Sequence, residues 1–351
     1  MSAVLYPTYS PRLSQAQAIL KEHALLLGIV GVHFLIALLL CWKYPAKYQQ
    51  SLQLPNYLLT LALGVCFALC GFTLYVMVVK RPHQLVRYLR QELRRHLTSE
   101  RVLFALPVLG MMPLFASSFT VIKAAVPLYQ PFAWDARLAY ADQVLHGGIQ
   151  PWLLLQGVLG HPAVTAAINF VYHLWFFIML GSIYWLAFAL ELKQLRMQFV
   201  LSFVASWILL GNVVALLFSS AGPCYYGHVV GGADPYAPLM SYLHSAAKDY
   251  PVWALSVQDM LWKEFSENSG TNALSIAAMP SMHVGTAVLL ALMGWRLNRT
   301  AGILLTIFAV LIMLGSVHLG WHYALDGYVA ALGAVLIWLA VGRLPQVRRL
   351  G

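Results

Sequence analysis

The sequence predicts an all-α membrane protein, a polytopic bundle of about eight transmembrane helices. Of its 351 residues, 60% are hydrophobic and only 10% are Asp, Glu, Lys or Arg, whereas soluble domains carry roughly 25% charged residues. The mean hydropathy is +0.71, and several uncharged runs of about 20 residues are each long enough to cross a ~30 Å hydrocarbon core. A soluble globule is excluded, and so is a transmembrane β-barrel, whose strands would show short alternating segments.

Eight apolar runs define the expected spans in chain order. They cover residues 24–42, 57–79, 102–122, 163–190, 198–219, 280–297, 301–321 and 326–342. The first two spans and the basic segment after them form an N-terminal unit, residues 1–100. The other six spans form a second unit, residues 101–342, and a short tail follows at 343–351.

The basic residues are concentrated on one side of the expected membrane. Seven of the 22 Lys and Arg residues lie between the second and third spans, at 80–101, and an excess of this kind is typical of cytoplasmic loops. An even number of spans then places both termini in the cytoplasm, with 16 basic residues inside and six outside. The net charge of +10 is therefore a topology signal, and we expect no nucleic-acid partner.

Two connections on the expected external side are longer than the topology requires. Residues 123–162 and 220–279 are rich in Gly, Pro and aromatic residues, a composition that favours short helices at the membrane interface. One such helix is expected near residues 253–267. Long segments between spans are more often walls of functional sites than spacers.

Three polar side chains occur where the expected spans meet the external surface. His322 and Asp326 are four residues apart, a spacing that places them on one face of a helix within reach of a hydrogen bond. A carboxylate in this position fixes the imidazole tautomer and leaves Nε2 free as a nucleophile or base. His283 lies 39 residues before His322. One span crosses the membrane after His283 and the next crosses back, so His322 returns to the same membrane level as His283. The sequence therefore predicts one pocket that holds all three.

Two histidines and a carboxylate suit phosphoryl transfer through a covalent phosphohistidine. One imidazole attacks phosphorus, the other protonates the leaving oxygen, and the carboxylate steadies the charge on the nucleophile. Backbone amides at the start of the sixth span, where Pro280 suits the first helical turn, would help to hold phosphate oxygens. The four cysteines show no zinc-ligand spacing, so we expect neither a metal nor a cofactor.

The motif Pro280-Ser281-Met282-His283, followed by His322-Tyr323-Ala324-Leu325-Asp326, resembles the membrane-bound type-2 phosphatidic acid phosphatase superfamily. It is most similar to the branch of the inositol phosphorylceramide synthases and, more distantly, of the sphingomyelin synthases. Residues 221–226 and the stretch from Asp135 through Asp142 to Tyr172 also resemble that branch. The resemblance covers roughly residues 130–340 and implies that the last six spans form a catalytic core of that superfamily.

The resemblance also implies roles for three residues. His322 falls on the nucleophile of the superfamily, Asp326 on the residue that orients it, and His283 on the general acid. The sequence departs from the broader superfamily because no Lys-x6-Arg-Pro motif precedes the site and Gly315-Ser316 stands where a Ser-Arg pair is usual. The usual phosphate-binding cations are therefore missing, a loss that the phosphotransferase branch tolerates.

Seven further residues are candidates for binding the substrate, because they are external cations or lie beside the motifs. They are His318, Ser281, Tyr225, Tyr226, Lys123, Arg137 and Lys248. His318 is four residues before His322 and is expected to contact the substrate rather than a metal, since a metal would occupy the nitrogens that a phosphohistidine requires. External cations are few, so we expect one or two of them to bind phosphate.

The expected function is phosphoryl transfer from a lipid-linked phosphate or phosphodiester at the extracytoplasmic face. A hydroxyl acceptor would make the protein a lipid head-group phosphotransferase of the inositol phosphorylceramide synthase type. Water would make it a lipid phosphate phosphatase, acting on phosphatidate or a polyprenyl (di)phosphate. A transporter of a phosphorylated solute is a third hypothesis, but it predicts an internal repeat and broken helices in matched halves, which the sequence does not show.

Overall fold

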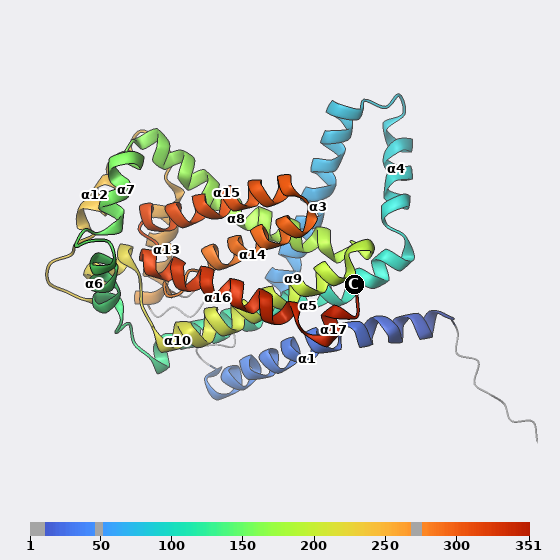
Figure 1. The fold of residues 1–351 in the computed structure, drawn as a ribbon, viewed down its shortest axis with the longest axis horizontal. Coiled ribbons are helices and arrows are strands. Elements are labelled where there is room, and N and C mark those ends of the chain that lie inside the picture. Colours follow the sequence, from blue (N-terminus) through green and yellow to red (C-terminus); the bar gives the residue numbers. More distant parts are fainter. Residues whose placement is uncertain (1–10, 46–51, 268–275) are drawn as a thin grey trace, which may run out of the picture.

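The computed structural model describes residues 11–45, 52–267 and 276–351, and within these ranges the protein is helical and contains no strand. Long helices run side by side, and the short helices α6, α7, α12 and α13 gather at one end of the bundle (Figure 1). The predicted all-α membrane fold is confirmed.

Seven helices in the described part of the chain are long and apolar enough to cross a membrane. They are α1 (Pro11–Lys43), α3 (Leu54–Tyr75), α5 (Ser99–Tyr129), α8 (Pro162–Ala187), α9 (Lys193–Ile208), α15 (Arg299–His318) and α16 (Ala324–Gly342). The π-helical turn Val76–Lys80 continues α3. The 3₁₀ turn Leu190–Leu192 precedes α9, and the π-helical turn Leu209–Val214 and α10 (Ala215–Leu217) continue it. The seven long helices correspond to seven of the eight predicted spans. The protein is therefore an integral membrane protein.

The sixth predicted span is a helix that is too short to cross the bilayer alone. α14 (Met282–Leu297) has 16 residues, which make about 24 Å of helix against a hydrocarbon core of ~30 Å. It contacts α8, α9, α15 and α16, and nine of its residues are buried. Its neighbours shield α14 from lipid, so its length is not set by the thickness of the bilayer.

A tight hairpin joins α14 to α15. The side chain of Asn298, between the two helices, accepts a hydrogen bond from the backbone N–H of Ala301 at 2.9 Å. A Cβ atom at Gly294 would lie 2.8 Å from the carbonyl oxygen of Ala301, so this crossing requires glycine. The hairpin returns the chain from the far end of α14 to the level of His283.

α1 is joined to the rest of the bundle by a buried histidine. His33 Nδ1 lies 2.7 Å from the hydroxyl of Ser118 on α5. The side-chain N–H of Asn212, in the π-helical turn after α9, lies 2.9 Å from His33 Nε2 and donates to it. His33 therefore bonds α1 to two other helical segments, whereas the unit boundary at residue 100 stays a prediction.

Short helices connect the long ones, and one more follows α16. They are α4 (Leu85–His96), α6 (Asp135–Leu145), α7 (Pro151–Leu159), α11 (Tyr226–Val229, preceded by the 3₁₀ turn Pro223–Tyr225), α12 (Ala237–Ala246), α13 (Trp253–Ser266) and α17 (Pro345–Arg348). The prediction of short helices in the two long connections, residues 123–162 and 220–279, is confirmed by α6, α7, α12 and α13. Residues 268–275 of the second connection lie outside the described residues.

Candidate active site

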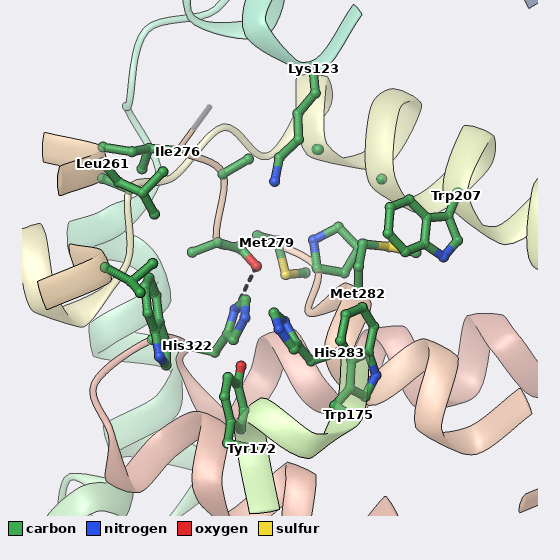
Figure 2. A pocket seen from close by; sticks show the side chains of 18 of the residues that line it. Lys123, Tyr172, Trp175, Trp207, Leu261, Ile276, Met279, Met282, His283 and His322 are labelled. Carbon is green, nitrogen blue, oxygen red and sulfur yellow. Dashed lines mark hydrogen bonds between the residues drawn. The ribbon is translucent and has the colours of Figure 1, made fainter. Parts of the chain in front are cut away.

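A cavity of about 360 Å³ lies where α5, α8, α9 and α14 meet the turn between α15 and α16. Its wall is largely aromatic and aliphatic, and a few polar side chains reach it. These polar side chains are Lys123, Tyr172, His173, Tyr225, His283 and His322. Figure 2 shows the two imidazoles of His283 and His322 beside each other, with Lys123 reaching in from the opposite wall. The volume falls within the range of small-molecule sites.

His322 is held by a backbone carbonyl. Its Nδ1 lies 2.8 Å from the carbonyl oxygen of Ala278 (Figure 2). The Oδ2 atom of Asp326 lies 3.4 Å from the same nitrogen. A carbonyl oxygen only accepts hydrogen bonds, so Nδ1 carries the proton and donates it. Nε2 of the neutral ring is then unprotonated and free to act as a nucleophile.

The prediction that one helix carries both His322 and Asp326 is wrong. α16 begins only at Ala324, because Asp326 Oδ2 accepts a hydrogen bond from the backbone N–H of Tyr323 at 3.1 Å and caps the helix. His322 lies in the turn before this cap. The imidazole and the carboxylate still meet, across the first turn of the helix rather than along one face.

His283 lies in the first turn of α14 between aromatic rings. Its ring stacks on Tyr172 with centroids 4.6 Å apart and packs against Trp175 at 4.3 Å. The centroid of His322 is 6.2 Å away. The two imidazoles therefore face one small space, His283 from the first turn of α14 and His322 from the turn before α16.

The start of α14 also differs from expectation. The hydroxyl of Ser281 accepts a hydrogen bond from the backbone N–H of Val284 and caps the helix. Pro280 lies in front of this cap and not in the first turn. Ser281 is buried and its hydroxyl is engaged by the cap, while Pro280 itself lines the cavity.

Two loops at the cavity are held by the buried carboxylate of Asp135, at the start of α6. It accepts hydrogen bonds from the backbone N–H groups of Ala221 and Gly222 at 2.9 and 2.8 Å, and from the Tyr323 hydroxyl at 2.8 Å. Burial raises the pKa of this carboxyl, and the two N–H groups and the Tyr323 hydroxyl oppose that rise. Asp135 thus fixes both the 221–222 turn and the residue after His322.

A second carboxylate on the same helix holds the start of α16. Asp142 comes two turns after Asp135, on the same face of α6, and accepts from the N–H groups of Ala324 and Leu325 at 2.7 and 2.9 Å. These are N–H groups that the first helical turn leaves unpaired, and a negative charge is favourable there. Burial raises the pKa of Asp142 as well, against the effect of these two N–H groups. The pair of carboxylates clamps the segment that carries His322.

Gly222 allows the loops to approach each other closely. Its φ is +104°, and a Cβ atom there would lie 2.7 Å from the carbonyl oxygen of Trp321, the residue before His322. Both the backbone conformation and the contact require glycine. The loop that Asp135 holds therefore packs directly on the turn that carries the imidazole.

Of the seven predicted substrate-binding residues, Lys123 and Tyr225 line the cavity. Lys123 is the only Lys or Arg among the described lining residues. The hydroxyl of Tyr225 donates to the carbonyl oxygen of Gln258 at 2.9 Å, so Tyr225 presents mainly its ring.

The other predicted substrate-binding residues lie outside the cavity lining. His318 is buried, with its Nε2 2.9 Å from the hydroxyl of Thr165 on α8. Tyr226 packs on Tyr236 with ring centroids 5.5 Å apart. Arg137 lies over the ring of Trp134, and Lys248 is exposed in the turn after α12. In the described ranges no group of three His, Cys, Asp or Glu side chains could hold a metal ion.

Comparison with known proteins identifies the family. No curated protein and no solved structure matches the chain. A family model described as the PAP2 superfamily matches residues 136–341. That segment contains His283, His322 and Asp326, begins directly after Asp135, and leaves Lys123 outside. Since it covers more than half of the 351 residues, the chain belongs to the PAP2 superfamily.

Proposed function

We propose that the protein transfers a phosphoryl group from a lipid-linked phosphate or phosphodiester through a phosphohistidine at His322. Membership of the PAP2 superfamily supports a membrane enzyme of the phosphatase or phosphotransferase type. The observation that carries the proposal is the pair of imidazoles, His322 and His283, which face one cavity with centroids 6.2 Å apart. The hydrogen bond from Nδ1 of His322 to Ala278 leaves its Nε2 available for attack.

The proposed reaction has two steps. In the first, Nε2 of His322 attacks phosphorus, the bond from phosphorus to the leaving oxygen breaks, and His283 gives a proton to that oxygen. Burial lowers the pKa of His283 well below its usual range, and the negative charge of a bound phosphate favours the protonated ring that this step requires. In the second, a hydroxyl or water attacks the phosphohistidine, His283 takes up the acceptor's proton, and the nitrogen–phosphorus bond breaks. Asp326, 3.4 Å from Nδ1, stabilises the imidazole while it is bonded to phosphorus and positively charged.

We propose that Lys123 binds the phosphate. Its ammonium group points into the cavity toward the imidazoles (Figure 2). Phosphoryl transfer depends mainly on positioning and on stabilising charge, and a cation in a water-poor cavity does both. Lys123 lies on α5, outside the segment that matches the family, so the cation would come from a helix that precedes the family segment.

We propose a hydroxyl-bearing molecule as the acceptor, which would make the protein a lipid head-group phosphotransferase of the kind that the sequence resembles. Aromatic rings such as those of Trp175 and Trp207 line the cavity and offer water few partners, which favours a bound acceptor over bulk water. The volume of about 360 Å³ lies in the range of sites for small organic ligands, which is enough for more than a phosphate group. Water as the acceptor is the alternative and would make the protein a phosphatase.

The cavity is proposed to face the extracytoplasmic side. The short helices α6, α7, α12 and α13 gather at one end of the bundle, and the C-terminus lies toward the other end (Figure 1). Of these short helices, α13 lines the cavity through Val257 and Leu261. The excess of 16 basic residues over six supports a cytoplasmic location for the end that carries the C-terminus.

Purified protein incubated with lipid phosphates tests the proposed function. We expect phosphate release or head-group exchange, and we expect addition of a polyol to convert part of the product from inorganic phosphate into a phosphodiester or phosphomonoester of that polyol. Mass spectrometry of the products measures both outcomes. Uptake of a phosphorylated solute into proteoliposomes without any chemical change would contradict the proposal and support a transporter.

Substitution of Gly222 by alanine tests the arrangement of the loops. The added Cβ would meet Trp321 and displace the turn that carries His322, so we expect turnover to fall by about 100-fold, as misplacement by ~1 Å can cause. Gly231→Ala is the matched control, because Gly231 also has positive φ, +73°, but open space around it. Its turnover should equal that of the unmodified protein, and equal losses in both variants would show that backbone strain alone explains the effect.

A further inference from the structure

Tyr172 carries a buried hydroxyl that the chain itself leaves unused. The residue is 4% exposed, and its hydroxyl has no hydrogen-bond partner among the described residues. A buried donor without a partner costs free energy, so native proteins rarely keep one without a reason. A bound ligand that accepts a hydrogen bond would remove that cost.

The hydroxyl lies at the reacting position. Tyr172 lines the cavity, and its ring stacks on the imidazole of His283 at an interplanar angle of 22°. Figure 2 shows the hydroxyl pointing toward the gap between His283 and His322. The proposed function places the phosphoryl group in this gap.

Two other side-chain donors at the cavity are already engaged, whereas the indole N–H groups of Trp175 and Trp321, which also line it, have no hydrogen-bond partner among the described residues. The Tyr225 hydroxyl donates to Gln258, and the indole N–H of Trp207 donates to the Thr286 hydroxyl at 3.1 Å. Lys123 is the only Lys or Arg among the described lining residues. A phosphoryl group with two or three charged oxygens therefore meets fewer cations than oxygens and needs neutral donors.

We propose that the Tyr172 hydroxyl donates a hydrogen bond to a non-bridging oxygen of the phosphoryl group, and so completes the phosphate site together with Lys123. This inference rests on the proposed function and adds a substrate-contacting residue to it. A neutral donor fixed before the reaction stabilises negative charge on oxygen in a water-poor site. Because the ring is held against His283, the donor keeps one position through both steps.

Tyr172→Phe tests this proposal, since it removes the hydroxyl and keeps the ring against His283. We expect the turnover number with a lipid phosphate to fall by about 10- to 100-fold, the range for one hydrogen bond to a charged group. We also expect weaker inhibition by orthovanadate, which resembles the phosphoryl group in the transition state of its transfer. The control is Tyr184→Phe, which removes a hydroxyl from the same helix away from the cavity lining and should change neither value.

Two further measurements separate the possible failures. Direct titration with inorganic phosphate and vanadate reports on Tyr172 without requiring turnover, and we expect weaker binding to Tyr172→Phe than to Tyr184→Phe. Equal binding and equal turnover in the two variants would overturn the role of Tyr172. Absence of chemistry by the unmodified protein with every lipid phosphate, while Tyr172 still contributes to phosphate binding, would overturn the proposed function alone.

Discussion

His322→Asn should abolish turnover, with a loss of at least about 10⁴-fold. The asparagine amide can still donate to the carbonyl oxygen of Ala278, which His322 Nδ1 contacts at 2.8 Å, so the local fold is kept. It has no atom in the place of Nε2, and no nitrogen–phosphorus bond can form. The rate of phosphate release or head-group exchange measures the loss, and His244→Asn, an exposed position on α12, serves as the control.

The phosphohistidine itself can be trapped in the partner variant. His283→Asn slows the first step, but least for a substrate whose leaving group needs no proton. With such a substrate the second step, which lacks its base, becomes slow and labelled phosphoenzyme should accumulate. The label should be lost in acid and kept in base, as expected for phosphorus bonded to nitrogen. Retained turnover in His322→Asn, or label on a residue other than His322, would contradict the proposed mechanism.

The pattern of apolar residues was enough to predict the architecture, because spanning a bilayer imposes a length and a composition that are visible in sequence. Seven of the eight predicted spans meet that criterion as helices. α14 does not meet it, because α14 packs against other helices, and this packing rather than the bilayer sets its length of 16 residues. The hydropathy of a run does not distinguish these two environments.

The motifs were enough to bring the central residues together, but not to assign the side chains around them. His318 has the spacing of a neighbour of His322, yet its ring turns to Thr165, because α15 ends at His318 and the chain reverses at Gly320, where φ is +75°. Tyr172 ends the stretch that resembles the family, but the resemblance gave it no role, and a tyrosine in an apolar helix is more often an interface residue. Its contact with His283 depends on how α8 packs against α14.

The carboxylates of α6 show what sequence could not reveal about positioning. Asp135 and Asp142 belong to the stretch that resembles the family, but resemblance gave them no role. Their partners, among them Gly222, Tyr323 and Ala324, come from segments 86 to 188 residues away. Apart from the Tyr323 hydroxyl, these partners are backbone N–H groups. Every residue except proline has such a group, so no residue type in the sequence marks them.

Asp135→Ala should lower both stability and turnover. Three donors lose their acceptor, the N–H groups of Ala221 and Gly222 and the hydroxyl of Tyr323. Hydrogen bonds to a charged group contribute about 1.5–3 kcal/mol each and are not additive within one cluster. We expect the free energy of unfolding to fall by about 3–5 kcal/mol, measured by thermal or denaturant unfolding in detergent.

The effect of Asp135→Ala on turnover should have the signature of lost positioning. Asp135 does not line the cavity, and it reaches His322 only through Tyr323 and the turn at Gly222, so we expect the turnover number to fall while KM changes little. Asp142→Ala is the comparison, since it removes only the acceptor of two N–H groups at the start of α16; it should cost about 1–2 kcal/mol, as loss of a helix cap does. If Asp135→Ala unfolded no more easily than Asp142→Ala and kept full turnover, the loops around His322 would have to be held by their apolar contacts alone.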